Sequence, residues 1–151
     1  ETIEIALHAA ETGHLVFSTL HTLSAVKSID RIIEVFPGDQ QAQVRASLSE
    51  SLRAVIAQTL LRRRDEKGRV GCYEILLATS AVRNLIRDSK THQIPALMEA
   101  GKRYGMQTLD EALQALLDQG IISAQDAWTK AVNKNKFRQF LDVQPDDLLD
   151  F

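Results

Sequence analysis

The chain has 151 residues, of which 44% are hydrophobic and only 5% aromatic, so it is long enough for one ordinary domain with a mainly aliphatic core. Its formal net charge of −2 at pH 7 argues against a nucleic-acid-binding surface, which needs a clustered basic excess. The single cysteine, Cys72, excludes a disulfide framework within the chain and a four-cysteine zinc site, and no apolar run approaches the roughly 18 residues that a membrane span needs.

The N-terminal region predicts a helix followed by a strand. Apolar residues recur at helical spacing at Ile3, Leu7 and Ala10, and Gly13 ends this segment. Leu15–Leu20 is a short, mostly apolar run, which predicts a strand buried on both faces, as in a parallel sheet covered by helices.

Two further helices and a hairpin are predicted next. One helix stops at Pro37-Gly38, and the other, from about Gln41 to Leu60, carries a regular amphipathic ladder. Residues 58–64 and 69–78 both look extended and flank the polar turn Asp65–Gly68, which predicts a β-hairpin.

The chain after Thr79 has a helical pattern throughout. Pro95 falls in the first turn of one predicted helix, where its missing N–H costs little. Capping residues mark two further helix starts, at Thr108 with Glu111 and at Ser123 with Asp126. Residues 144–151 are acidic and are predicted to be loose.

This element order predicts an incomplete α/β domain, because one parallel strand cannot make a sheet and a hairpin is a poor edge by itself. The chain also lacks an initiator methionine, so we expect it to be a piece of a longer protein. We divide it into a sheet-containing part (residues 1–78), a helical region (79–143) and a flexible tail (144–151).

Three motifs resemble those of PilT-type pilus retraction ATPases, in the type II/IV secretion ATPase superfamily. Thr12–Thr22 (TGHLVFSTLHT) resembles the histidine box of this family, and Ala81–Ile86 (AVRNLI) resembles its AIRNLI motif. Gly105–Asp110 (GMQTLD) resembles the GMQTLD segment of the family. The resemblance implies the C-terminal half of a RecA-like P-loop NTPase domain, with few strands and a β-hairpin, followed by an all-helical C-terminal region.

The candidate catalytic residues are His14 and His21, which bracket the predicted strand. They are seven residues apart, so in an extended segment they point to opposite faces, which argues against a metal pair. Ligands of open α/β sheets bind beyond the carboxyl ends of the strands. His21 and Thr22 lie at that end, so His21 is the better candidate for donating a hydrogen bond to a nucleotide phosphate and Thr22 is a cofactor-binding candidate. The resemblance implies a role for both histidines, whereas the residues alone equally allow His14 to cap the strand and His21 to be an exposed loop residue.

The residues of the candidate retraction motif are Ala81, Val82, Arg83, Asn84, Leu85 and Ile86. They can be a short helix with a buried apolar stripe and a solvated polar face. The resemblance implies instead that the segment is required for retraction and not for nucleotide binding, which makes Arg83 and Asn84 candidates for mechanical coupling.

Two other features have a structural interpretation. The basic cluster Arg62–Arg64 lies at the predicted hairpin tip and is interpreted as solvated, with contact to a subunit, a nucleotide or an acidic membrane partner as the alternative. Cys72, between Gly71 and Tyr73 in a predicted strand, is interpreted as a core residue and not as a nucleophile.

The sequence contains no G-x-x-x-x-G-K-[ST] motif, so no glycine-rich loop of this chain cradles phosphates. The resemblance places that loop, the Walker B carboxylate, the catalytic glutamate and the arginine fingers upstream. We therefore expect ATP and Mg²⁺ to be cofactors of the intact protein, and we expect this chain alone to be inactive and to bind neither tightly. We predict no metal site within the chain.

The resemblance implies a homo-hexameric motor ATPase that powers type IV pilus retraction and twitching motility. It would be cytoplasmic, peripheral at the inner membrane and in contact with a pilus platform protein, with no nucleic acid and no direct membrane insertion. The single cysteine argues against the zinc-binding assembly and secretion ATPases, and the Ala81–Ile86 motif favours a PilT-type over a PilU-like motor.

Two alternatives are a non-enzymatic helical interaction module and a related PilU-like or secretion ATPase. A DNA-binding helix-turn-helix over Thr108–Ala131 is disfavoured, because Asp126, Trp128 and Lys130 are a poor set for reading bases. A strand at Leu15–Leu20 with both edges needing partners would favour the motor, and a closed all-helical core would favour the module.

Overall fold

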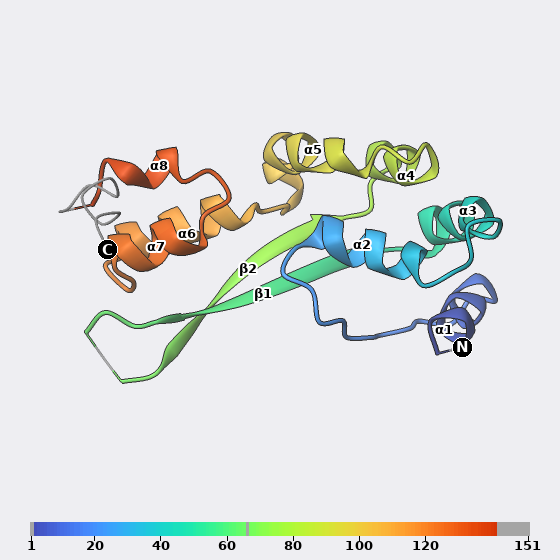
Figure 1. Cartoon of the computed structure of the whole chain (residues 1–151), viewed down its shortest axis with the longest axis horizontal. Helices are drawn as coiled ribbons and strands as arrows, with labels where there is room; N and C mark the ends of the chain where they lie inside the picture. The colour runs from blue at the N-terminus through green and yellow to red at the C-terminus, as the bar shows by residue number, and fades with distance from the viewer. Residues whose placement is uncertain (1, 66, 142–151) are drawn as a thin grey trace. The chain divides into compact units, whose positions relative to one another are not determined.

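The computed structural model describes residues 2–65 and 67–141, which fall into two compact units. Unit 1 comprises residues 1–57 and 74–107, and unit 2 comprises residues 58–73 and 108–151. The elements in chain order are α1 (Thr2–Glu11), α2 (Ala25–Glu34), α3 (Gln41–Ser51), β1 (Ala54–Arg62), β2 (Arg69–Leu77), α4 (Ser80–Arg87), η1 (Thr91–Gln93), α5 (Ile94–Ala100), η2 (Lys102–Tyr104), α6 (Leu109–Asp118), α7 (Ala124–Lys130) and α8 (Asn135–Arg138) (Figure 1).

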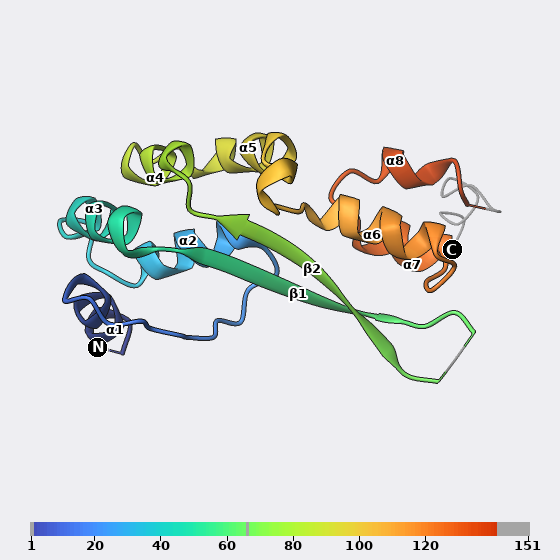
Figure 2. The same cartoon turned by 180° about the vertical axis from the view of Figure 1, so that it is seen from behind.

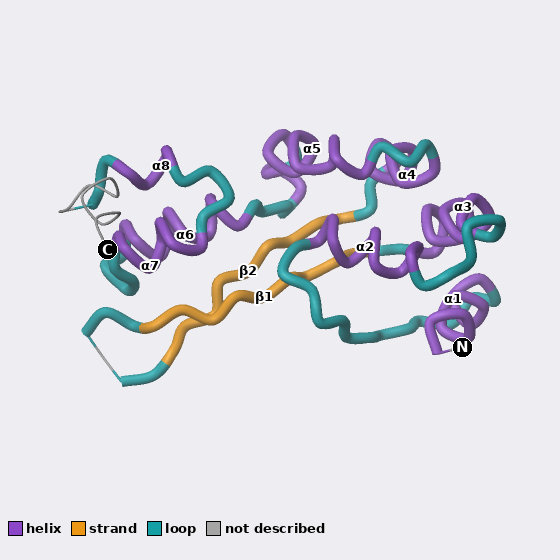
Figure 3. The backbone as a smooth tube through the Cα atoms, in the orientation of Figure 1, coloured by secondary structure: helices purple, strands orange, loops and turns teal. Residues whose placement is uncertain are grey.

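The predicted strand at Leu15–Leu20 is wrong for this chain. The segment between α1 and α2 has no regular secondary structure and is drawn as a loop in Figure 3. Leu15 is 77% exposed and Phe17 is 88% exposed, the opposite of burial on both faces. A strand needs a neighbour for its backbone N–H and C=O groups, and the sheet that the described residues form contains β1 and β2 alone.

The predicted helix from Gln41 to Leu60 is too long. Helix α3 ends at Ser51, and Leu52 has φ −60° and ψ 134°, which takes the backbone out of the helical region. The next nine residues form β1, which pairs with β2. The predicted hairpin of β1 and β2 is therefore confirmed (Figure 2). Its first strand begins at Ala54 and not at Gln58.

Unit 1 has a core of aliphatic side chains from four helices and the end of β2. Helix α3 packs against α1, α2 and α4. The buried side chains are Ala25, Ile29, Ile33, Val44, Leu48, Leu76, Val82, Ile86, Ile94, Met98 and Met106. Pro95 lies in the first turn of α5, as predicted.

Unit 2 is built on α6, whose start confirms the predicted capping box. The Thr108 hydroxyl accepts a hydrogen bond from the Glu111 backbone N–H at 3.3 Å, and the Glu111 carboxylate accepts one from the Thr108 N–H at 3.0 Å. Ser123 caps α7 in the predicted way, accepting from Asp126 N at 3.0 Å. The buried side chains are Leu61, Cys72, Leu109, Ala112, Leu113, Ile122, Ala127, Ala131 and Phe137.

The motif Gly105–Asp110 has a local structural explanation. Gly105 has φ +91°, a conformation that favours glycine, and Gln107 exchanges backbone hydrogen bonds with Ile75 at 2.8 and 2.9 Å. Asp110 is 7% exposed, and its two carboxylate oxygens accept from Val132 N at 2.8 Å and Asn133 N at 2.9 Å. The motif therefore makes a turn, a bridge and a buried hydrogen-bonded carboxylate.

The two compact units do not follow the predicted boundary near residue 78. Leu76 and Val82 lie on opposite sides of that boundary and share the core of unit 1. The tail at residues 144–151 lies outside the described residues. The functional division at residues 78 and 143 stays a prediction.

Cys72 is 1% exposed, which confirms its interpretation as a core residue. Burial, and after it the negative charge of Asp110, raise the pKa of the thiol from 9.0 to about 11. The described residues contain no group of three His, Cys, Asp or Glu suited to a metal ion, and none of their helices is long and apolar enough to span a membrane.

The raised thiol pKa predicts a loss of stability in alkali. Because the unfolded chain loses the Cys72 proton near pH 9 and the folded chain near pH 11, the free energy of unfolding falls between these values, by about 2–3 kcal/mol. The measurement is urea unfolding at a series of pH values from 8 to 11. Cys72→Ala removes this part of the slope, and equal slopes for both proteins would contradict the prediction.

Candidate functional site

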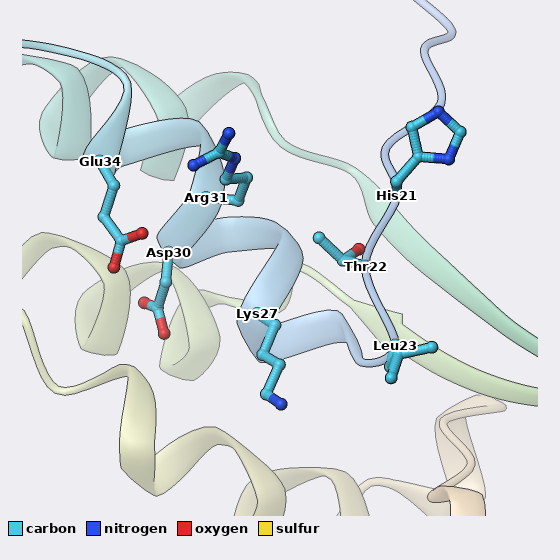
Figure 4. A pocket seen from close by; sticks show the side chains of 7 residues that line it. All are labelled: His21, Thr22, Leu23, Lys27, Asp30, Arg31 and Glu34. Carbon is cyan, nitrogen blue, oxygen red and sulfur yellow. The ribbon is translucent and has the colours of Figure 1, made fainter.

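The candidate site is a cavity of about 390 Å³ that runs along α2 and the segment before it, within unit 1 (Figure 4). Three residues come from the segment that leads into the helix and four from the helix itself. The lining residues are His21, Thr22, Leu23, Lys27, Asp30, Arg31 and Glu34. The structure thus brings His21 and Thr22, two predicted site residues, to one cavity.

Charges of both signs line the helical wall of the cavity. Lys27 and Arg31 are four residues apart, as are Asp30 and Glu34, so each pair lies on one side of the helix. Both cations are exposed. The two cations on the helical wall can contact a phosphate group, but Asp30 and Glu34 on the same helix cancel the net charge of Lys27 and Arg31. The sequence analysis did not identify Lys27 and Arg31 as site residues, although they follow His21 closely in the chain.

The Thr22 hydroxyl is part of a short hydrogen-bond chain. Its oxygen lies 2.6 Å from the Ser28 hydroxyl, which in turn donates to the Ser24 carbonyl at 3.0 Å. Because Ser28 has a single proton and a carbonyl only accepts, Thr22 is the donor in the first contact. Thr22 therefore offers an acceptor oxygen to a ligand in the cavity. Its side chain points toward α2, whereas the His21 ring points to the other side of the segment (Figure 4).

His14 is not brought to the cavity. Its Nδ1 lies 3.2 Å from the Ala9 carbonyl oxygen and 3.2 Å from the Thr12 hydroxyl, at the C-terminal end of α1. Since a carbonyl only accepts, Nδ1 carries the proton in this contact. The ring therefore closes the end of α1, and a catalytic role for His14 stays a prediction.

The candidate retraction motif is α4, an amphipathic helix of unit 1 capped by Thr79. Val82 and Ile86 are fully buried and Leu85 packs against the same core, which confirms the predicted stripe. Arg83 is half-buried and its Nε donates to the Ala78 carbonyl at 2.9 Å, so it is not a purely solvated residue. Ala81 and Asn84 are exposed, and Ala81 lines a second cavity of about 550 Å³.

The fold of this chain matches solved structures of a pilus motor and of an ATPase. The structure superposes on the pilus retraction motor PilT with bound ADP with a TM-score of 0.79 and 44% sequence identity, covering 89% of this chain and 37% of that one. It also superposes on the ATPase DotB of Legionella pneumophila with a TM-score of 0.70 and 29% identity, covering 83% of this chain and 34% of that one. The fold is therefore part of a RecA-like ATPase domain, as predicted.

The family follows from the sequence comparisons. The profile of the family described as "Type II/IV secretion system protein" matches residues 1–133, and this chain belongs to that family. It is 54% identical over 133 residues to a twitching motility protein of Neisseria gonorrhoeae, covering 88% of this chain and 36% of the relative. It is 53% identical over 131 residues to the type IV pilus retraction ATPase PilT of Pseudomonas aeruginosa, covering 87% and 38%. The identity to the type IV pilus ATPase PilU of the same species is 42% over 138 residues, covering 91% and 36%. The chain thus spans a little over a third of the length of these relatives.

Proposed function

We propose that this chain is part of a homo-hexameric motor ATPase that powers type IV pilus retraction and twitching motility. The observation that carries the proposal is the 53% identity to the retraction ATPase of P. aeruginosa, which extends over 87% of the chain. A PilU-like motor is the second candidate, favoured less because the identity falls to 42%. The match of the secretion-family profile to residues 1–133 supports the motor over the non-enzymatic module. The structure has neither a strand at Leu15–Leu20 nor a closed all-helical core among the described residues, so the fold does not choose between the two.

The role of the cavity in this motor is contact with the nucleotide. His21 donates a hydrogen bond to an oxygen of the terminal phosphate, and Lys27 and Arg31 on α2 are further possible donors to a phosphate. The cavity residues include donors for a phosphate but only two carboxylates, Asp30 and Glu34, and the described residues contain no group of three His, Cys, Asp or Glu suited to a metal ion such as Mg²⁺. ATP and Mg²⁺ supply phosphoryl transfer in the assembled motor, with the phosphate-binding loop and the metal carboxylate provided by residues outside this sequence.

The motor acts at the cytoplasmic face of the inner membrane, where it drives a pilus platform protein. The direct test compares ATP turnover of the full-length protein with that of the purified 151-residue chain. We expect turnover only in the full-length protein, and turnover by the short chain would contradict the proposal that the phosphate-binding loop lies elsewhere.

Asn84 offers a test of the retraction motif that leaves the fold intact. It is exposed on α4, unlike Val82 and Ile86, so Asn84→Ala removes no core contact. We expect ATP turnover within about twofold of the wild type, as for other surface substitutions, together with a loss of twitching motility. The measurements are a turnover assay and colony expansion. Asn84→Ala with normal motility would remove Asn84 from the coupling surface.

A further inference from the structure

Glu74 is a buried carboxylate of unit 1. It belongs neither to the hydrophobic core nor to the lining of the cavity. It lies on β2 and is 8% exposed. Its Oε1 accepts a hydrogen bond from the backbone N–H of Ala25 at 2.6 Å, across 49 residues of sequence. Within residues 2–65 and 67–141 it has no ion-pair partner. A buried carboxylate is costly unless it is hydrogen-bonded, so its location calls for an explanation.

The bond from Glu74 reaches the first residue of α2. The first N–H groups of a helix have no partner within the helix, and the negative charge also lies at the positive end of the helix dipole. Ser24 accepts from Lys27 N at 3.2 Å and leaves the Ala25 N–H to Glu74. Two acceptors therefore fix the start of α2, one of them from its own chain segment and one from β2.

The cavity segment is attached to this anchored helix start. His21 and Leu23 are exposed, whereas Thr22 is held by its 2.6 Å hydrogen bond to Ser28 in the first turn of α2. The position of His21 relative to the rest of unit 1 is consequently set by where α2 begins. The contact between Ala25 and Glu74 is one of the contacts that hold this helix start, beside the core packing of Ala25 and Ile29.

We infer that Glu74 is a positioning residue for the nucleotide site, which holds the start of α2 against β2 and thereby places His21 and Thr22. The inference rests on the proposed function, in which His21 contacts the terminal phosphate. A displacement of about 1 Å in a catalytic arrangement can cost on the order of 100-fold in rate, so the loss of this anchor lowers kcat. Nucleotide affinity, which depends on many other contacts, changes little.

The competing explanation is that Glu74 only stabilises the fold as a helix cap does. Removal of a cap costs about 1 kcal/mol and leaves the activity per folded molecule unchanged. Asp110 of unit 2 is a matched control, because it is equally buried at 7% exposed and also accepts from backbone N–H groups. It lines neither cavity.

The experiment measures kcat and the Kd for ADP in the full-length protein. We expect Glu74→Ala to lower kcat at least about tenfold while the Kd for ADP stays within about threefold. Glu74→Gln keeps an oxygen that accepts from Ala25 N and is expected to retain most of the kcat. If the alanine variant does not fold, Glu74→Asp replaces it in this test, because it keeps the charge but withdraws the carboxylate oxygens from Ala25 N by one methylene. Asp110→Ala is expected to lower stability and to leave kcat per folded molecule unchanged.

A double-mutant cycle with His21→Ala separates the inference from the proposed function. If Glu74 acts through His21, Glu74→Ala adds little to the loss of kcat already caused by His21→Ala. Full additivity of the two losses of kcat overturns the inference. A normal kcat in Glu74→Ala and Glu74→Asp beside a low kcat in His21→Ala overturns the inference alone. A normal kcat in His21→Ala overturns both.

Discussion

His21→Ala in the full-length protein lowers ATP turnover by about 100-fold or more, a loss comparable with removal of one donor to a transition-state oxyanion. The reason is that the ring borders the candidate phosphate cavity together with Lys27 and Arg31. The contact matters most when charge moves onto the phosphoryl oxygens, so the Kd for ADP changes by less than about threefold. The measurements are steady-state turnover and ADP titration.

His14→Ala is the matched control, because it removes the same side chain from the same segment. The His14 ring bonds Ala9 and Thr12 at the end of α1 and does not line the cavity. From these contacts we expect its substitution to loosen the end of α1 and to change turnover by less than about threefold, a result that would count against the catalytic role that the resemblance implies for His14. His21→Gln, which keeps an N–H donor, should recover part of the lost turnover. Equal losses in His14→Ala and His21→Ala would show that the cavity does not define the site.

The features that the sequence predicts well are local ones. The capping box of Thr108 and Glu111, the cap at Ser123 and the buried stripe of Val82 and Ile86 depend on residues three or four apart. The hairpin turn is local too. Such signals are satisfied within one element, so they can be read from one stretch of sequence.

The predictions that are wrong concern elements whose structure depends on partners distant in the sequence. Leu15–Leu20 has the composition of an inner strand, yet a strand forms only with a neighbour, and none of the described residues supplies one. Residues 52–60 continue the helical spacing of α3, but cross-strand pairing with β2 overrides it.

The burial of Glu74 could have been predicted from the sequence pattern of β2. Cys72, Glu74 and Leu76 alternate along β2 and are all buried, so the period-two pattern places a carboxylate on the inward side of a strand. That pattern predicts a buried acid with a partner. It cannot name Ala25 as the partner, because the two residues are 49 positions apart.

Asp110→Ala is expected to lower the free energy of unfolding of unit 2 by about 3 kcal/mol. The carboxylate accepts from two backbone N–H groups, Val132 and Asn133, and hydrogen bonds to a charged group contribute about 1.5–3 kcal/mol each. Asp110→Asn keeps one acceptor oxygen and turns an NH₂ group toward the other N–H, so we expect a loss of about 2 kcal/mol. The measurements are urea unfolding and hydrogen exchange of residues 131–138.

Asp118→Ala is the control for this prediction, since Asp118 is an exposed aspartate of the same helix and bonds the Gln114 side chain. The Asp118→Ala variant should change the free energy of unfolding by less than about 0.5 kcal/mol.

A second readout, the pKa of the Cys72 thiol, separates the effect of the Asp110 charge from that of its hydrogen bonds. Because that charge helps to raise the Cys72 pKa to about 11, Asp110→Asn lowers this pKa while burial still holds it above 9.0. A stability loss without a fall in the thiol pKa would mean that the carboxylate acts through its two hydrogen bonds alone.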